Sequence, residues 1–221
     1  MRMLFCNIAW MKYYKGNFGS LIDEPIGGGS YVRDNKDGHE KYNFDPADMT
    51  FDDDRFPAGR YCLGFVETKS LGEKSNQLHI EKIEGCELYN KEEAVEDVLV
   101  IYCATQPAHR FTTIVGWYKH ATVYRVYHKA VFSSGDDEEV QWYNVIAKEY
   151  DCVLLPVSER SRKTVWNVPR KQTGAAYGFG RANVWFAQNT EGNRLLVEFL
   201  NKISKQIDEY EGENWINKYP E

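Results

Sequence analysis

The sequence lacks the patterns that mark several large classes of protein. No run of about 18 apolar residues occurs, so we expect nothing in the chain to span a membrane. The opening residues turn polar too early for a signal peptide. No P-loop, GxSxG or HExxH motif is present, which removes three common catalytic signatures. Hydrophobic residues make up 43% and charged residues 27% of the 221 positions, so a folded globular chain is expected.

Cysteine is scarce and follows no metal-binding or disulfide pattern. The five cysteines are odd in number, contain no CxxC pair and lie mostly in apolar, strand-like runs: Cys6, Cys62, Cys86, Cys103 and Cys152. Free thiols buried in a reducing compartment explain this usage best, which predicts a cytoplasmic protein. The five histidines form no cluster with them, so no metal site and no cofactor is expected.

The charge is unevenly distributed along the chain. The net charge of −6 argues by itself against a nucleic-acid partner. However, residues 105–131 hold four basic residues and 160–190 hold six, and neither stretch contains an acid. The two stretches together carry a charge of +10, so the remainder of the chain carries a net charge of −16. Because local field steers a polyanion more than net charge does, the two acid-free stretches predict a focused basic site.

Short runs rich in Val, Ile, Tyr, Phe and Trp dominate the sequence and predict strands. We expect strands at 4–10, 61–67, 77–83, 97–105, 112–118, 122–132, 140–147, 152–156 and 183–188. The run 97–105 is continuously apolar and predicts a central strand, whereas the alternation of 77–83 predicts a half-exposed one. No βαβ rhythm appears. The sequence therefore predicts a mainly β (α+β) fold with a twisted, mostly antiparallel sheet or partial barrel.

Helices are few. Leu196, Phe199, Leu200, Ile203 and Ile207 follow helical 3–4 spacing, which predicts one amphipathic helix near the C-terminus. Residues 91–97 are compatible with a short helical turn. We therefore divide the chain into a β-rich domain, 1–190, and a C-terminal helix and tail, 191–221, which either docks on the domain or leads into a catalytic domain.

Three aromatic stretches lie beside basic residues. In 111–125, Gly116 precedes Trp117 and Tyr118, and such a glycine would let the backbone pass close to a ligand. In 165–188, Trp166 and Trp185 flank a glycine-rich basic stretch. Trp10 ends the first predicted strand. Aromatic faces beside cations suit an extruded base and its phosphates. The plainer interpretation places these rings in an ordinary core and the basic stretch in a solvated loop.

An enzymatic alternative rests on a metal-dependent nuclease pattern. Asp54 precedes a predicted strand, and Glu67 and Lys69 follow it, in the order Asp then ExK that holds Mg²⁺ and activates water in one class of nucleases. The pattern is short and common, and the helices that such a core requires are not predicted. We keep it as an alternative to binding.

Several blocks of the sequence resemble a known family. NIAWMKYYKG, GGGSYV, IVGWYKHATVYR and FGRANVWFA are similar to an N-terminal domain of bacterial HNH-type, modification-dependent restriction proteins. They are more distantly similar to the PUA-like group, which includes EVE and YTH domains. The resemblance implies a PUA-like barrel with an aromatic pocket for a flipped, modified base. The pocket residues that it suggests are Trp10, Trp117, Tyr118, Trp166 and Trp185.

The expected function is therefore a DNA-binding reader of a modified base that gives specificity to a nuclease. The residues do not distinguish DNA from RNA, and no HNH motif occurs, so the nuclease would be a further domain or a partner protein. Contacts to the nucleic-acid backbone are expected from Arg110, Lys119, Arg125, Arg160, Arg162, Lys163, Arg170, Lys171 and Arg181. A protein-interaction β domain is the remaining alternative. The reader hypothesis predicts that 105–131 and 160–190 meet in space, with Trp117 between them.

Overall fold

The computed structural model describes residues 2–16, 23–27, 39–53, 55–68, 77–106, 111–134 and 137–220. The strands are β1 (Met3–Ile8), β2 (Ala47–Met49), β3 (Gly59–Gly64), β4 (Ala94–Thr105), β5 (Thr112–Ser134), β6 (Asp137–Lys148), β7 (Cys152–Leu154) and β8 (Val184–Trp185). The helix is α2 (Arg194–Asp208), and short 3-10 turns lie at His39–Tyr42, Ile80–Lys82, Glu149–Asp151, Lys171–Thr173 and Trp215–Asn217. No helix of the described chain is both long and apolar enough to cross a bilayer.

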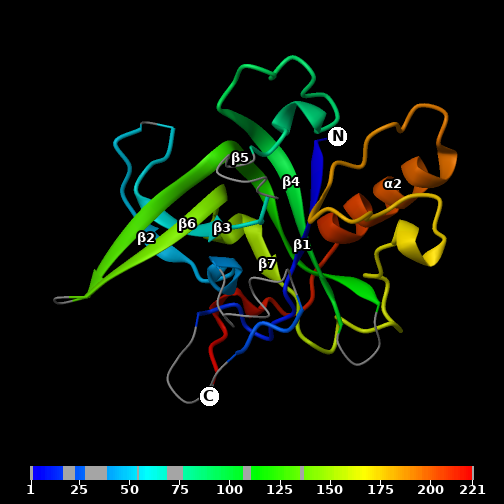
Figure 1. Ribbon diagram of the computed structural model, residues 1–221. Helices are drawn as coiled ribbons and strands as arrows, with labels where there is room; N and C mark the ends of the chain where they lie inside the picture. The colour runs from blue at the N-terminus through cyan, green and yellow to red at the C-terminus, as the bar shows by residue number, and fades with distance from the viewer. Residues whose placement is uncertain are drawn as a thin grey trace.

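The strands form one open sheet with the order β2-β3-β6-β5-β4-β1-β8, and β7 pairs with β5 beside this path. Among the named strands of the described residues, the pairings are antiparallel except that of β1 with β4. The predicted mainly β, mostly antiparallel architecture is thus confirmed. Figure 1 shows β1 and β4 side by side, with α2 packed to one side of them.

The longest strand, β5, joins two regions that the sequence predicts as separate strands. Its first half pairs with β4 and its second half with β6, and the register shifts where the partner changes. His120 adopts a left-handed backbone conformation (φ 49°) at the predicted break. The break is therefore a local irregularity rather than a turn, because Ala121 still pairs with Val98 of β4.

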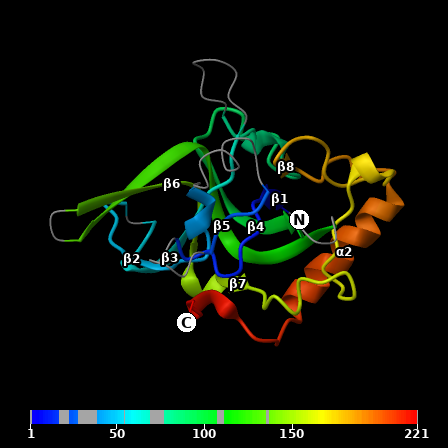
Figure 2. The ribbon, with the colours of Figure 1, turned by 60° about the horizontal axis from the view of Figure 1, so that its bottom comes forward.

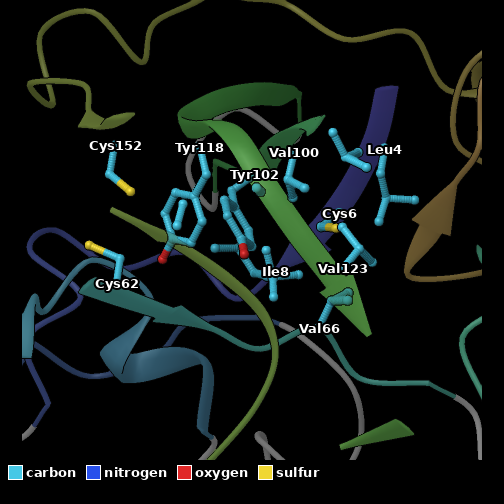
Figure 3. Packing of buried hydrophobic residues seen from close by; sticks show 14 of the residues in the cluster. Leu4, Cys6, Ile8, Cys62, Val66, Val100, Tyr102, Tyr118, Val123 and Cys152 are labelled. Atoms are coloured by element: carbon cyan, nitrogen blue, oxygen red, sulfur yellow. The ribbon is translucent and has the colours of Figure 1, made fainter. Parts of the chain in front are cut away.

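Both faces of the central strands are buried. In β1, Leu4, Cys6 and Ile8 face one apolar cluster, and Met3 and Phe5 face a second cluster on the other side. Strand β4 alternates in the same way, which explains why its sequence is continuously apolar and confirms it as a central strand. Figure 3 shows the first cluster, in which the β4 and β5 tyrosines lie close together. Helix α2 covers the second cluster with Ile203 and Ile207.

Two predicted elements are wrong. Residues 77–83 contain the 3-10 turn Ile80–Lys82 rather than a strand, and the turn brings Ile80 and Ile83 into the core together. The alternation in this run therefore reflects one buried face and no sheet pairing. Residues 94–97 begin β4 instead of forming a helical turn, because Val95 packs in the core opposite Val123 of β5.

The C-terminal tail docks on the β-rich part. Asn214 binds the backbone of β7, accepting from the Leu154 N–H (3.0 Å) and donating to the Cys152 carbonyl (2.9 Å). Ile216 is buried, and its carbonyl accepts a hydrogen bond from the buried ammonium of Lys15. Helix α2 and the tail thus pack against the β-rich part of the described chain. All five cysteines are buried and free, as expected.

Candidate functional site

Three of the predicted pocket rings lie in the core. Trp117 is 1% exposed, Tyr118 is fully buried and Trp166 is 3% exposed. The Trp117 and Trp166 rings stack at 5.3 Å, and the Tyr210 ring packs edge-on against Trp117 at 5.4 Å. These side chains therefore do not line a surface pocket in this structure. Helix α2 and the residues that follow it cover Trp117 and Trp166, whereas Tyr118 packs against Phe44 and Tyr102 in the first cluster.

Gly116 serves packing rather than ligand access. A Cβ at this position would lie 2.3 Å from the Val153 carbonyl oxygen and 2.6 Å from the Phe44 ring. The glycine thus lets β7 and Phe44 approach β5 closely, which corrects the expectation that it lets a ligand approach.

Trp10 and Trp185 keep part of their surface. Trp185 of β8 is half-buried against Phe5, with ring centroids 4.5 Å apart, and it belongs to the cluster beneath α2. Trp10 lies just beyond β1, where its backbone pairs with Ile26 and the Arg160 guanidinium lies 5.9 Å from its ring centroid. Trp10 is therefore the predicted pocket residue nearest the carboxyl end of β1.

Three of the predicted phosphate contacts are held by other parts of the protein. Arg160 is 1% exposed and donates to the carbonyl oxygens of Leu155, Met11 and Lys12. The guanidinium of Arg125 pairs with Glu81 at 2.7 Å and also binds two carbonyl oxygens. The ammonium of Lys119 lies 2.8 Å from Asp208 of α2. These three cations bind other groups of the protein. The structure therefore corrects the expectation that they contact a nucleic-acid backbone.

Arg170 is half-buried and ties three strands together. It donates to Oδ1 of Asn7 at the end of β1, to Oγ1 of Thr112 at the start of β5, and to Oγ1 of Thr105 at the end of β4 (3.2 Å). It lies where the carboxyl ends of the parallel strands β1 and β4 meet, so it places a guanidinium at that end of the sheet.

The remaining predicted cations are exposed. They are Arg162, Lys163, Lys171 and Arg181; Arg110 lies outside the described residues. Arg162 and Lys163 follow Arg160, which anchors their turn to the backbone just beyond β1. Lys171 follows Arg170, and Arg181 precedes Asn183, whose carbonyl accepts from the Asn7 N–H (2.6 Å). Both pairs of exposed cations thus belong to segments anchored at the carboxyl end of β1.

The two acid-free stretches meet at the start of β5. The Ile114 N–H donates to the Trp166 carbonyl (2.8 Å), and the Val168 N–H donates to the Thr112 carbonyl (3.0 Å). The predicted contact between 105–131 and 160–190 is therefore present here, although Trp117 lies buried at it. The second half of β5 runs away from this contact into the hairpin with β6 (Figures 1 and 2).

A buried carboxyl group that the sequence analysis missed lies at the same end of β1. Glu40 is 4% exposed, and its Oε2 accepts from the Ala9 N–H at 2.7 Å. Burial, reinforced by the charge of Glu67, raises the pKa of Glu40 to about 7, and the hydrogen bond from Ala9 opposes this rise. Glu67 in turn accepts from the Asn183 side chain at 3.2 Å. A strongly shifted carboxyl group beside charged residues is typical of functional sites.

Half-buried rings accompany these carboxyl groups. Phe65 and Tyr127 stack with centroids 5.0 Å apart, and the His39 ring lies 5.4 Å from Phe65. Burial raises the pKa of Tyr127, and the charges of Glu67 and Glu40 add to the rise, so the three groups are neighbours. We call this region the β1-end site; it comprises Asn7, Trp10, Glu40, Phe65, Glu67, Tyr127, Arg170 and Asn183.

Of the three residues in the nuclease pattern, only Glu67 lies within the described residues. Asp54 and Lys69 lie outside the described residues. Within the described chain, no group of three or more His, Cys, Asp or Glu side chains is arranged to hold a metal ion. The structure therefore adds no support for the nuclease alternative.

Comparison with known proteins gives no family assignment. No family model, no curated protein and no solved structure matches the chain.

Proposed function

We propose that the chain binds nucleic acid and reads a modified base at the β1-end site, giving specificity to a restriction-type nuclease. The observation that carries the proposal is the position of Glu40. This buried carboxyl group, with a pKa of about 7, binds the backbone N–H of Ala9, the residue before Trp10, and lies at the same end of β1 as Arg170. Such a site combines a polar group for a base edge with rings for its faces.

The chemistry of the site suits an extruded base. A carboxylate accepts from an exocyclic amine such as N4 of cytosine, and aromatic faces stack on the base. In this proposal Trp10, Phe65 and Tyr127 replace the buried Trp117, Tyr118 and Trp166 as pocket rings. The PUA-like interpretation of the sheet is part of the proposal and rests on the resemblance of the short sequence blocks.

The exposed cations supply the backbone contacts in this proposal. Lys171 and Arg181 precede Asn183, which binds the backbone of Asn7, and Arg162 and Lys163 lie on the turn anchored next to Trp10. Such contacts to phosphates position the nucleic acid without reading its sequence. Cleavage belongs to a nuclease domain or a partner nuclease.

Binding to matched oligonucleotides tests the proposal. DNA duplexes of one sequence carrying cytosine, 5-methylcytosine or 5-hydroxymethylcytosine, and an RNA of the same sequence, are titrated at several salt concentrations. We expect one modified DNA to bind at least tenfold more tightly than the unmodified duplex. The variant Lys171→Gln/Arg181→Gln weakens binding to all duplexes and flattens the salt dependence, because two phosphate contacts are lost.

Glu40→Gln tests base reading separately. This variant keeps a hydrogen-bond acceptor for the Ala9 N–H but changes the group offered to a base edge. We therefore expect the difference in affinity between the duplexes to become smaller, while the salt dependence of binding stays the same. Lys129→Gln is the matched control, because Lys129 lies in an acid-free stretch but on the exposed β5–β6 hairpin. Equal affinity of the parent protein for every duplex contradicts the proposal. A loss of affinity in Lys129→Gln as large as that in Lys171→Gln/Arg181→Gln also contradicts it.

A further inference from the structure

A cavity of about 720 Å³ lies at the other end of β1 from the proposed base-reading site. Arg2, which precedes β1, lines it, whereas Trp10 follows β1, and the strand between them spans about 20 Å. We call it the Tyr124 cavity. Its walls come from the chain around β2 and β3, the start of β4, and the β5–β6 pair, and they include Arg2, Phe51, Arg55, Glu93, Tyr124 and Tyr143.

Aromatic rings form much of the wall of the Tyr124 cavity. Tyr124 contacts His128 and Tyr143, with ring centroids 4.1 and 6.1 Å away. Phe51 and Phe56 lie 5.3 Å apart on another part of the wall. Ring faces attract cations through their quadrupole, and they do so most strongly where water is excluded.

Two tyrosine hydroxyls in the wall have no hydrogen-bond partner among the described residues. Tyr124 is 7% and Tyr143 6% exposed, and neither hydroxyl forms a hydrogen bond with another described residue. Burial raises the pKa of both, so both stay neutral at physiological pH. The charges of Arg55, Asp53 and Glu96 act on Tyr124, so its hydroxyl lies among the charged groups of the cavity. Both residues line the cavity, so these hydroxyls are available to a ligand bound there.

The charge of the wall is negative after its internal pairs are formed. Arg55 pairs with Asp53 at 2.6 Å and lies 3.6 Å from Glu96. Arg2 donates to the Glu96 carbonyl and to the Tyr89 hydroxyl. The other carboxylates of the wall have no ion-pair partner in the described chain: Asp52, Glu92 and Glu93.

From these observations we propose that the Tyr124 cavity binds an alkylammonium group. The rings contact the alkyl chain and the cation, the tyrosine hydroxyls accept its N–H donors, and the unpaired carboxylates balance its charge. A free polyamine and a lysine side chain of another protein share this chemistry. A quaternary ammonium ion lacks the N–H donors, so it uses only the rings and the charge.

Titration with spermidine, with a glycine-flanked lysine peptide and with tetramethylammonium, followed by calorimetry on the full chain, tests the proposal. We expect saturable 1:1 binding of spermidine or the peptide, and whichever binds identifies the source of the ammonium. Tyr124→Phe, which removes only the hydroxyl, lowers that affinity about tenfold and leaves tetramethylammonium binding unchanged. Asp52→Asn/Glu93→Gln lowers the affinity for all cations at least tenfold.

Glu198→Gln is the control for charge, because Glu198 is exposed on α2, outside the cavity wall. Circular dichroism and thermal unfolding establish that each variant is folded. Absence of saturable binding by both spermidine and the peptide overturns the proposal. Equal affinity in the parent protein and in the Asp52→Asn/Glu93→Gln variant also overturns it.

Discussion

Trp117 of β5 and Trp166 stack in the core, with ring centroids 5.3 Å apart and an angle of 30° between the rings. Each belongs to one of the two acid-free stretches, so the stack joins these stretches beneath the C-terminal residues. The rings that most resemble a base pocket in the sequence therefore contribute to stability in the structure.

Trp117→Ala should lower the free energy of unfolding by about 3–5 kcal/mol, because it removes a buried ring and leaves a cavity. Chemical denaturation monitored by circular dichroism measures the loss. Trp185→Ala, in which a half-exposed ring is removed, should lose less. A Trp117→Ala protein with parental stability but impaired binding to the modified duplex would restore Trp117 to the pocket.

Arg160→Lys should destabilise the protein by about 2–4 kcal/mol. The planar guanidinium donates to three backbone carbonyls in two separate segments, and an ammonium cannot span them with one nitrogen. The same change at the exposed neighbour, Arg162→Lys, is the control and should be nearly neutral. Unfolding in urea compares the two, and similar midpoints for both variants would contradict the structural role of Arg160.

The sequence predicts the local part of this fold well and the long-range part less well. Residues 98–104 of β4 are apolar because both faces of the strand are covered, and the spacing of α2 shows its single buried face. The alternation of 77–83 is ambiguous, because a turn that buries two side chains produces a similar pattern.

The site depends on contacts that no local pattern encodes. Trp10 and Trp117 are similar in the sequence, each two residues before a lysine, yet Trp10 is half-buried whereas Trp117 is 1% exposed and packs against Tyr210. Glu40 lies in an acidic stretch, 34–55, which contains none of the predicted contact residues. Only the fold shows that its carboxylate binds the Ala9 backbone beyond β1.

Gly116→Ala should destabilise the protein by several kcal/mol. The added Cβ would lie 2.3 Å from the Val153 carbonyl oxygen, so β7 must shift away from β5 to accommodate it. Gly180→Ala is the matched control, because a Cβ there meets no atom within 4 Å. Thermal unfolding of both variants checks the prediction, and equal midpoints would show that β7 yields without cost.

The pH dependence of stability provides a test of the buried Glu40. Its pKa is about 7 in the folded protein against an ordinary value of 4.5, mainly because of burial. The folded state therefore holds this proton more tightly than the unfolded state. The stabilisation is fully present below pH 4.5 and is lost as the pH rises through 7, by about 3 kcal/mol in total.

Comparison with Glu40→Gln isolates this contribution, because glutamine does not titrate and still offers an oxygen to the Ala9 N–H. Urea unfolding of both proteins between pH 4 and pH 8 gives the difference in their free energies of unfolding. We expect the parent protein to lose about 3 kcal/mol relative to the variant over this interval. A difference that stays constant with pH would mean that Glu40 has the same pKa in the folded and unfolded states, and that a cation or solvent compensates its charge at the carboxyl end of β1.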